Sequence, residues 1–387
     1  MSEIRVMHIL DTLALGGAER AAINLVNELP RDKYRPYLCT TRSEGPLQDA
    51  VAADVEHIAL KRKSRFDFGG IRRMVDFISS QKIAILHAHG SSLFVAVSAA
   101  WFPPHPMVIW HAHYGRPALE DRRAWAHRAA LSRAKGVVTV NRQLAEWCRR
   151  RLAVPADKIW CVPNMVCTPE RAPQTSGLPG IPGSRIVCVA NLRVEKDHLN
   201  LIRAMALVVC AYPTAHLILV GAHSDSAYSA GSAYFETVNA EVARHSLDRH
   251  VSFLGQRKDV PALLRECDIG VLSSKTEGLP VSLLEYGMAG LPVVATQVGE
   301  CEEVLDRGGA GVLVPPQSPS ELAEGLLSLL RSPERRALFG ERFSRRVRSL
   351  YNASSVIKQV CRVYDSVLAS RQSERNCSEA VRNGAGA

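Results

Sequence analysis

The sequence predicts an α/β protein of two domains, each built on a doubly wound parallel sheet. Its 387 residues are more than one ordinary hydrophobic core organises, and they suit two domains of similar size. Short apolar runs typical of buried strands alternate with segments of helical periodicity, which is the pattern of parallel α/β sheets. Residues 164–184 are rich in Pro, Gly, Ser and Thr, and we interpret them as a linker between the domains.

In this interpretation the N-terminal domain covers residues 1–163. Its first strand is residues 4–10, and a helix follows the pair Gly16 and Gly17. Adjacent glycines let a ligand approach the backbone at a helix N-terminus, although a tight turn without a ligand explains them equally well. The remaining strands are predicted at residues 35–41, 55–60, 83–87, 107–110, 137–140 and 160–163, with helices at 68–80 and 91–101.

The C-terminal domain covers residues 185–353. The predicted strands are residues 185–190, 217–221, 251–255, 269–272, 291–295 and 311–315. The predicted helices are residues 199–210, a segment ending at 265, a segment ending at 290, and residues 319–330 and 333–350. A last helix is predicted at 354–369, and we expect the polar tail at 372–387 to be disordered.

Two carboxylates mark the segment between the strand at 269–272 and the helix after it. Glu277 follows the strand, and Glu285 lies eight residues further on. Because eight residues at ~3.6 per turn leave roughly 80° between side chains, the two acids would contact different parts of one extended ligand. Backbone amides of Gly278, Val281 and Ser282 at the helix start suit a phosphate group. The spacing fits equally well a Glu277 that caps the helix and a solvated Glu285.

Two cations follow the first strand of the C-terminal domain. Arg193 and Lys196 lie three residues apart, and such a pair can bind a pyrophosphate and stabilise a leaving nucleoside diphosphate. The alternative is a Lys196 that faces water at the start of a helix. Gly221 ends the next strand, where it lets the chain pass close to a base or a phosphate.

Two His-x-His pairs, His87 with His89 and His111 with His113, end neighbouring strands. Residues i and i+2 of a strand share one face, so each pair presents two polar groups at the sheet edge. A metal-dependent hydrolase is the competing hypothesis, but a metal site needs further ligands from later strands. Those strand ends offer the amides Asn141, Asn164 and Asn191. We therefore predict no metal site.

The segment from Glu277 to Thr296 resembles the signature of the retaining glycosyltransferases of family 4. That signature is Glu-x7-Glu within Glu-Gly-Leu/Phe-Pro/Gly, followed by Gly-x-Pro-Val-Val-Ala-Thr, and Glu277 and Glu285 match its two glutamates. The resemblance extends from Gly16 to about Tyr364. It implies the GT-B fold, in which two facing Rossmann-like domains with parallel sheets enclose a cleft. It also implies that the helix at 354–369 returns to the first domain.

The resemblance also implies roles for individual residues. In this family the first glutamate, here Glu277, contacts the donor sugar, and the second, here Glu285, contacts the ribose. A histidine of the first domain hydrogen-bonds the donor sugar near the reacting carbon; His113 matches it, with His111 as the nearest rival.

Further positions match the donor-binding segments of the family. Family members carry Gly-Gly-Ala/Thr-Glu-Arg facing the donor phosphate, and this chain has Gly16 and Gly17 at the start of the same five residues. The family's usual arginine position holds Asn191, so Arg193 would supply that charge beside Lys196. Backbone groups near Gln256 would contact the uracil or guanine edge.

Taken together, these features predict a retaining, metal-independent hexosyltransferase without a further cofactor. Its donor would be a UDP- or GDP-sugar, and its acceptor a hydroxyl of a lipid-linked or polysaccharide intermediate in envelope or exopolysaccharide biosynthesis. A sugar-nucleotide epimerase of similar fold and a non-catalytic nucleotide-sugar-binding module stay open as alternatives. The sequence does not identify the sugar, the base or the acceptor.

Charge and cysteine usage bear on location. The formal net charge is +10, and basic residues gather at 116–151 and 61–65. Because each basic side chain near an anionic membrane is worth roughly 1 kcal/mol, these clusters suit a peripheral contact with the inner face of the plasma membrane; a merely solvated surface is the alternative. Ten scattered cysteines without a Cys-x-x-Cys pair and the absence of a signal pattern favour the cytoplasm. No aromatic platform for nucleic acid accompanies the charge.

Overall fold

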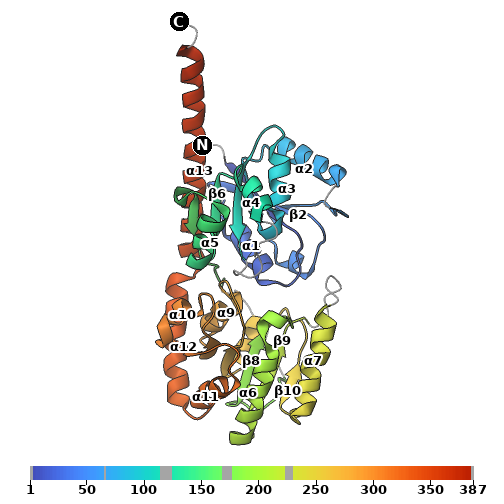
Figure 1. Ribbon diagram of the computed structural model, residues 1–387, viewed down its shortest axis with the longest axis vertical. Helices are drawn as coiled ribbons and strands as arrows, with labels where there is room; N and C mark the ends of the chain where they lie inside the picture. Colours follow the sequence, from blue (N-terminus) through green and yellow to red (C-terminus); the bar gives the residue numbers. More distant parts are fainter. Residues whose placement is uncertain (1–2, 65–66, 114–123, 168–176, 223–229, 385–387) are drawn as a thin grey trace. The chain divides into compact units, whose positions relative to one another are not determined.

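A computed structural model of the protein describes residues 3–64, 67–113, 124–167, 177–222 and 230–384. The chain divides into two compact units, Met1–Asn164 together with Ala353–Ala387 (unit 1) and Met165–Asn352 (unit 2). Each unit contains one sheet in which every strand pair is parallel (Figure 1). The predicted fold class, two Rossmann-like domains with parallel sheets, is therefore confirmed. Within the predicted linker, residues 168–176 lie outside the described part of the chain.

Unit 1 has a seven-stranded sheet in the order β3-β2-β1-β4-β5-β6-β7. Its strands are β1 (Ile4–Leu10), β2 (Tyr34–Thr40), β3 (Glu56–Ala59), β4 (Ile85–His89), β5 (Met107–Ala112), β6 (Gly136–Thr139) and β7 (Ile159–Cys161). Its α-helices are α1 (Gly17–Glu28), α2 (Phe68–Ser80), α3 (Leu93–Ala100), α4 (Ala124–Leu131), α5 (Arg142–Leu152) and α13 (Ala353–Gly384). Side-chain caps fix two helix starts: Asp67 accepts from the Gly70 amide at 2.8 Å, and Asn141 accepts from the Leu144 amide at 2.7 Å.

Unit 2 has a six-stranded sheet in the order β10-β9-β8-β11-β12-β13. Its strands are β8 (Arg185–Val189), β9 (His216–Val220), β10 (Val251–Phe253), β11 (Ile269–Leu272), β12 (Val293–Thr296) and β13 (Val312–Val314). Its α-helices are α6 (His198–Ala211), α7 (Ala230–Arg244), α8 (Val260–Arg265), α9 (Val281–Ala289), α10 (Cys301–Val304), α11 (Pro319–Leu330) and α12 (Pro333–Leu350).

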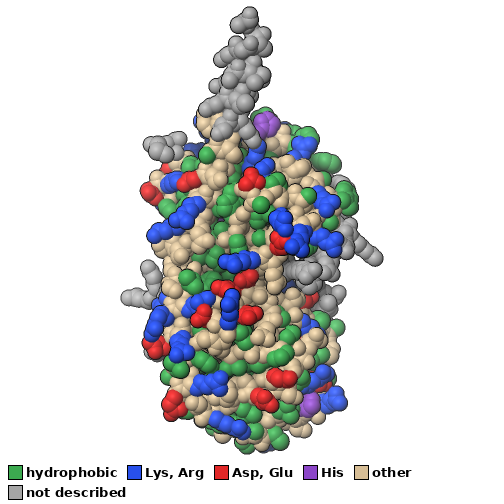
Figure 2. Space-filling view, turned by 60° about the vertical axis from the view of Figure 1, so that its left-hand side comes forward, with side chains coloured by type: hydrophobic (Ala, Val, Ile, Leu, Met, Phe, Trp, Pro, Cys, Tyr) green, Lys and Arg blue, Asp and Glu red, His purple; other side chains and the backbone are tan. Residues whose placement is uncertain are grey.

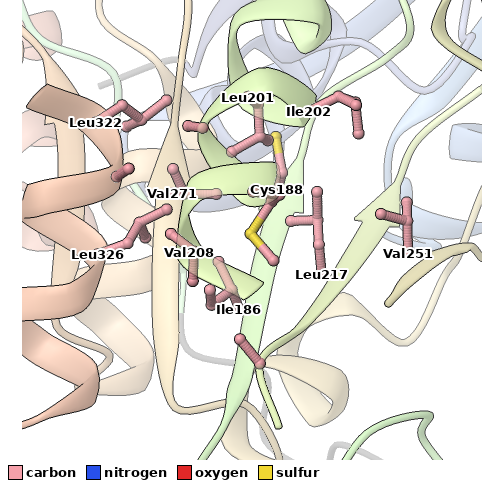
Figure 3. Close-up of a cluster of buried hydrophobic side chains, with 14 of the residues drawn as sticks. Ile186, Cys188, Leu201, Ile202, Val208, Leu217, Val251, Val271, Leu322 and Leu326 are labelled. Atoms are coloured by element: carbon pink, nitrogen blue, oxygen red, sulfur yellow. The ribbon is translucent and has the colours of Figure 1, made fainter. Parts of the chain in front are cut away.

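The core of unit 2 lies where α6, α7 and α11 cover one face of its sheet. Apolar side chains from these helices pack on Ile186 and Cys188 of β8 and on Val271 of β11. These three strand residues are at most 3% exposed. Figure 3 shows part of this cluster, with Leu201 of α6 and Leu326 of α11 among its members. Burial of this kind removes apolar area from water at about 25 cal/mol per Å², so it holds β8 and β11 firmly beside each other.

The other face of this sheet is covered by α9, which is fixed by one tyrosine. The Tyr286 hydroxyl accepts from the Val189 amide at 2.7 Å and donates to the Val271 carbonyl at 3.3 Å. Its ring lies on Gly270, where a Cβ atom would come within 2.8 Å of it. Because Glu285 precedes Tyr286 directly, this contact also sets the position of the candidate carboxylates on α9.

The central strands of unit 1 carry a layer of buried histidines. His8 of β1 is in register with His87 of β4, and His89 of β4 is in register with His111 of β5. These four side chains are at most 4% exposed. Burial lowers the pKa of His8 to about 3, and it lowers the pKa of His87, His89 and His111 well below the ordinary value. All four rings are therefore neutral near pH 7.

The C-terminal tail differs from the sequence-based expectation. Residues 372–387 are expected to be disordered, but α13 continues to Gly384. Extending an existing helix costs far less than nucleating one, and no Gly or Pro interrupts the chain between Ala353 and Gly384.

None of the helices in the described ranges combines the length and the apolar character that crossing a lipid bilayer requires.

The histidine layer predicts acid sensitivity. The unfolded chain binds protons at these histidines below about pH 6.5, whereas the folded protein, with lowered pKa values, does not, so stability is lost as the pH falls. Each buried histidine removes up to about 1.4 kcal/mol per pH unit. We expect Tm to fall steeply from pH 6.5 to pH 5, above the range in which most carboxylates titrate. Thermal unfolding across this range measures the slope, and His105→Asn, at an exposed position, should leave it unchanged. A flat Tm would contradict the prediction.

Candidate functional site

A buried ion pair lies at the carboxyl edge of the unit 2 sheet. Lys196 Nζ is 2.6 Å from Glu277 Oε1, and the Ser274 hydroxyl donates to the same oxygen at 2.6 Å. The Glu277 side chain is 8% exposed, whereas that of Lys196 is 27% exposed. Both contacts of Glu277 with described residues use Oε1, so Oε2 is left for a ligand. The ammonium of Lys196 has three N–H donors. Its exposed part is left to donate to a second ligand group.

The loops that carry this pair are joined by hydrogen bonds. The Ser273 hydroxyl donates to the Lys196 carbonyl at 2.9 Å, and the Lys275 amide donates to the Glu195 carbonyl at 2.8 Å. Lys275 Nζ also lies 3.5 Å from Asp197 Oδ1. These bonds tie the loop after β8 to the loop after β11. Lys196 and Glu277 are therefore held in place before any ligand binds.

A glycine supports the Glu277 loop from behind. A Cβ atom at Gly299 would lie 2.3 Å from the Glu277 carbonyl oxygen, and its φ of +55° favours glycine. Its neighbour Glu300 donates from its amide to the Gly278 carbonyl at 3.0 Å. The Glu277–Gly278 backbone is thus fixed by the segment after β12.

Helix α9 begins beyond this loop, with Pro280 at its N-cap and no side-chain cap. Glu277 does not cap the helix, so that alternative is wrong: the side chain turns to Lys196 instead. Val281 and Ser282 form the first turn, where backbone amides have no partner within the helix. Glu285 lies in the second turn and is half-buried. The predicted acids and amides are therefore brought together on one continuous segment.

Three further predicted donor-binding residues follow β9, β10 and β8 of the same parallel sheet. Gly221 follows β9, and a Cβ there would meet the Ala190 carbonyl oxygen at 2.1 Å, so close backbone packing requires this glycine with or without a ligand. Gln256 is exposed beyond β10, and Arg193 is exposed at the N-cap of the short 3-10 helix Val194–Lys196. Asn191 accepts from the Ala222 amide at 3.0 Å, a structural use of the position where the family usually has arginine.

In unit 1, Gly16 is the N-cap of α1 and Gly17 its first residue. A Cβ atom at Gly16 would lie 2.1 Å from Glu19 Oε2, because this carboxylate folds back over the helix start. Because this carboxylate is the far end of a flexible side chain, a Cβ atom would displace it at little cost, so the contact does not by itself require glycine at this position. Whether a phosphate binds at this helix start stays a prediction.

His113 directly follows β5, beside the buried histidine layer. His89 Nδ1 is 2.8 Å from His113 Nε2, and the two rings stack. Burial lowers the pKa of His113 to about 4, against a hydrogen bond with Asn164 that raises it. His113 is half-buried, whereas its rival His111 is 2% exposed and hydrogen-bonded to His87. His113 is thus the histidine of this pair that lies nearer the surface of unit 1.

The histidines also meet the geometric condition for a metal site. Two trios each offer one nitrogen per ring within 4.8 Å of the others: His8, His87 and His89, and His89, His111 and His113. The strands that supply them, β1, β4 and β5, are neighbours in the sheet, so the rings of adjacent strands provide the third nitrogen without any ligand from a later strand. The prediction that no metal binds is not tested by this geometry.

Sequence reasoning missed four residues of these two clusters. Ser274 and Lys275 support the Glu277 loop, and His8 and Tyr364 belong to the histidine layer. The only sequence signal for His8 was a polar residue inside an otherwise apolar strand. Tyr364 gave no signal, since it lies 356 residues from His8 along the chain.

Both halves of the chain match known families. Residues 15–169 match the family described as Glycosyltransferase Family 4, and residues 182–346 match the family described as Glycosyl transferases group 1. A curated relative from Escherichia coli, UDP-Gal:alpha-D-GlcNAc-diphosphoundecaprenol alpha-1,3-galactosyltransferase, is 23% identical over 77% of this chain and 80% of its own length. N-acetyl-alpha-D-glucosaminyl L-malate synthase of Bacillus anthracis is 27% identical over 47% of this chain, and the match spans 45% of that relative.

The fold is shared with solved structures. The crystal structure of Anabaena HepE in complex with UDP and glucose superposes with a TM-score of 0.79 at 18% identity, covering 94% of this chain and 100% of that one. This likeness establishes the fold, and the two family matches establish the kinship. The chain is therefore a glycosyltransferase of the family 4 type with the GT-B fold.

Proposed function

We propose that this glycosyltransferase moves a sugar from a UDP- or GDP-sugar to a hydroxyl group, with retention of anomeric configuration and without a metal ion. The observation that carries the proposal is the Lys196–Glu277 pair, with its 2.6 Å contact at the carboxyl edge of the unit 2 sheet. A buried carboxylate with one free oxygen suits sugar hydroxyls, and a cation beside it suits a diphosphate. Relatives named for UDP-linked sugars support the choice of donor.

Each site residue has a role in this reaction. Glu277 accepts hydrogen bonds from donor-sugar hydroxyls, and Glu285 binds the ribose. Lys196, with Arg193, neutralises charge on the departing diphosphate together with the amides of the first turn of α9. His113 donates a hydrogen bond to the sugar near the reacting carbon.

The bonding changes balance without a covalent enzyme intermediate. The bond between the anomeric carbon and the diphosphate oxygen breaks, and the acceptor oxygen bonds to the same face of that carbon. The proton of the acceptor hydroxyl passes to the departing diphosphate. Because Lys196 supplies positive charge at the leaving group, no divalent ion is required for this step.

The acceptor we propose is a lipid-linked or polysaccharide intermediate in envelope or exopolysaccharide biosynthesis. The Escherichia coli relative is named for a diphosphoundecaprenol-linked acceptor, and a Mycobacterium leprae relative for phosphatidyl-myo-inositol. Unit 1 has a surface that suits an interface with lipid: Trp101 and Phe102 are 58% and 50% exposed, and the Arg133 guanidinium lies 3.7 Å from the centre of the Trp101 ring. Indole rings and arginines favour the headgroup region of a membrane.

Several other basic residues of the described chain lie beside acidic ones. Arg149 and Arg150 both pair with Glu146, and Figure 2 shows Lys and Arg side chains mixed with Asp and Glu over one face. Arg116, Arg122 and Arg123 of the predicted basic cluster lie outside the described residues. Trp101, Phe102 and Arg133 are therefore the residues on which we base membrane contact.

Glu277→Gln should reduce release of the nucleoside diphosphate by about 100-fold or more, because the amide cannot hold Lys196 or accept sugar hydroxyls as the carboxylate does. The assay uses a panel of UDP- and GDP-sugars, with and without EDTA. Glu241→Gln is a matched control in the same unit, since Glu241 is also buried and pairs with Arg203 at 2.7 Å. Full activity in the Glu277 variant would exclude this site. A new sugar formed from donor alone, without release, would indicate an epimerase.

His113→Asn should lower kcat by about 100-fold, because a positioned hydrogen bond from the imidazole to the sugar is lost. Binding of UDP or GDP to unit 2 should be unchanged, since His113 belongs to unit 1. Calorimetric titration and initial rates separate the two effects. Unchanged kcat in this variant would remove His113 from the reaction.

Membrane contact predicts co-sedimentation with anionic vesicles at low salt. The double variant Trp101→Ser with Phe102→Ser should lose most of this binding, and 0.5 M salt should weaken that of the parent, since a Debye length of about 10 Å at 0.1 M shortens further. Leu338→Ser, at a residue of unit 2 that is 43% exposed, serves as control. Equal binding of the double variant and the parent would contradict the surface we name.

A further inference from the structure

The two sheets of this protein have the same central topology. The order β3-β2-β1-β4-β5 in unit 1 repeats as β10-β9-β8-β11-β12 in unit 2. In each sheet the chain adds strands on one side of the first strand and then crosses to its other side. Parallel sheets of this kind bind ligands at the carboxyl ends of the two strands beside that crossing, which is the topological switch point. The switch point lies between β8 and β11 in unit 2 and between β1 and β4 in unit 1.

In unit 2 the switch point holds the candidate donor site. Lys196 follows β8, Glu277 follows β11, and a serine hydroxyl bonds to the carboxylate. Unit 1 has a corresponding arrangement to which the reaction described above assigns no role. Asp11 directly follows β1, and Ser91 lies two residues beyond the end of β4. The Ser91 hydroxyl donates to Asp11 Oδ2 at 2.5 Å, so a carboxylate and a serine meet across this switch point as well.

Asp11 accepts a second hydrogen bond at its other oxygen. The hydroxyl of the buried Thr41 donates to Oδ1 at 2.6 Å. A carboxylate has about four lone-pair positions, and the two hydroxyls occupy one position on each oxygen. The Asp11 side chain is 25% exposed. It therefore keeps the capacity to accept hydrogen bonds from the hydroxyl groups of a ligand.

Main-chain bonds and a buried leucine fix the loops around Asp11. The Arg42 amide donates to the Asp11 carbonyl at 2.9 Å, which ties the loop after β2 to the loop after β1. The Ser92 hydroxyl donates to a β1 carbonyl at 2.7 Å, which ties the loop after β4 to the same strand. Leu13 is fully buried in an apolar cluster with residues of α1 and β2. Asp11 and Ser91 are therefore held in place before any ligand binds.

Two exposed cations lie at the same edge of the sheet. Arg42 follows β2, its side chain is 68% exposed, and its Nε lies 3.9 Å from Asp11 Oδ2. Lys61 follows β3, its side chain is 72% exposed, and its Nζ lies 3.7 Å from Glu44 Oε2. Charge-assisted hydrogen bonds are shorter, at about 2.7–2.9 Å, so these contacts leave N–H groups for a ligand. Guanidinium and ammonium groups are the side-chain groups that bind phosphate.

We propose that the switch point of unit 1 is the acceptor site, in which Asp11 binds a hydroxyl of the acceptor sugar. Arg42 and Lys61 bind a phosphate group attached to that sugar. This inference rests on the proposed function and narrows the acceptor to a phosphate-linked sugar. A carboxylate beside exposed cations suits a ligand that carries both hydroxyl and phosphate groups, whereas a neutral glycan carries only the first. Asp11 and the two cations thus determine the specificity for the acceptor.

The competing interpretation is a purely structural Asp11, which only ties the loops after β2 and β4 to β1. In that case Asp11 variants would lose thermal stability without any selective effect on a ligand. Arg42, which is exposed and has one 3.9 Å contact with Asp11, would then be replaceable without a change in binding. The test therefore measures binding in variants of both residues.

The first experiment measures binding to the full chain by calorimetric titration. The probes are citronellyl diphosphates that carry GlcNAc, GalNAc, glucose, galactose or mannose, and the free 1-phosphates of the same sugars. We expect at least one probe to bind more tightly than the octyl glycoside of its sugar, which has no phosphate. Tighter binding of the citronellyl diphosphate indicates a lipid-linked acceptor, and equal binding of the 1-phosphate indicates a soluble sugar phosphate. Binding by none of these probes, or equal binding of the glycoside, would overturn the proposal.

The second experiment repeats the titration of the best probe with variants of unit 1. Asp11→Asn and Arg42→Gln should each raise Kd by about tenfold or more, because each loses a charge-assisted hydrogen bond to the ligand. Asp54→Asn is the matched control, since Asp54 pairs with Arg31 at 2.6 Å and precedes β3, at the opposite edge of the same sheet. Its Kd should stay within about twofold of the parent. An unchanged Kd in either the Asp11 or the Arg42 variant would contradict the assignment.

A variant of unit 2 separates this site from the candidate donor site. Lys196→Gln should weaken binding of UDP or GDP and leave the Kd of the acceptor probe unchanged, whereas Asp11→Asn should show the reverse pattern. A probe whose binding is lost in the Lys196 variant occupies the donor site instead, and this result would exclude unit 1 as its binding site.

The two proposals fail in different ways. Probe binding that depends on Asp11, without release of UDP or GDP from any donor, would leave the site of unit 1 standing and remove the transfer reaction. Transfer to a probe with an unchanged KM for that probe in the Asp11→Asn variant would leave the reaction standing and remove the site. Arg42→Gln, at an exposed side chain, is decisive on its own if the Asp11 variant does not fold.

Discussion

The candidate donor site depends on one ion pair, between Lys196 and Glu277. Two loops that are far apart in sequence meet at this contact, 81 residues from one partner to the other. An unpaired carboxylate at 8% exposure would pay a large desolvation cost, so Lys196 is what permits Glu277 to stay buried and charged. The pair is more than a bridge for stability, because one oxygen of the acid and part of the ammonium stay open to a ligand. The surrounding serines, glycines and main-chain bonds fix its geometry.

Unit 1 handles buried polarity in another way. Its central strands carry no ion pair among the described histidines; neutral rings satisfy one another along a line that ends at His113 and His111. Such a network satisfies buried polar atoms without any net charge. The two units thus accommodate buried polar groups by different means, charge compensation in one and hydrogen bonds between neutral rings in the other.

Much of the fold followed from the sequence because strands and helices repeat with clear periodicity. The helices at Phe68–Ser80, Pro319–Leu330 and Pro333–Leu350 have the predicted bounds, each started by a cap or a proline that the sequence displays. The Glu277 segment could also be predicted from the sequence, since its acid, glycine, proline and helix are contiguous. The residues that contact Glu277 were harder to predict. Lys196 was predicted to bind a diphosphate, yet its contact with Glu277 depends on the adjacency of β8 and β11, which no local pattern encodes.

The histidine layer marks the limit of sequence reasoning. Each His-x-His pair is visible in the sequence, but the register that places His89 beside His111 is a property of the sheet. His8 sits in a strand whose apolar neighbours predicted only burial. The full length of α13 could not be inferred from composition either. Residues 372–387 are mostly polar, and this polarity led to the expectation of a disordered tail.

The position of Tyr364 has a consequence for how the chain matures. Unit 1 combines residues 1–164 with the segment Ala353–Ala387, which contains its last helix, α13. While the ribosome is still making unit 2, the sheet of unit 1 can assemble, but the hydroxyl that joins His8 to His87 has not yet been synthesised. The rings of β1 and β4 then lack the group that completes their bonding. The bonding of His8 and His87 is therefore completed only after Tyr364 has been synthesised and α13 has packed on the sheet of unit 1.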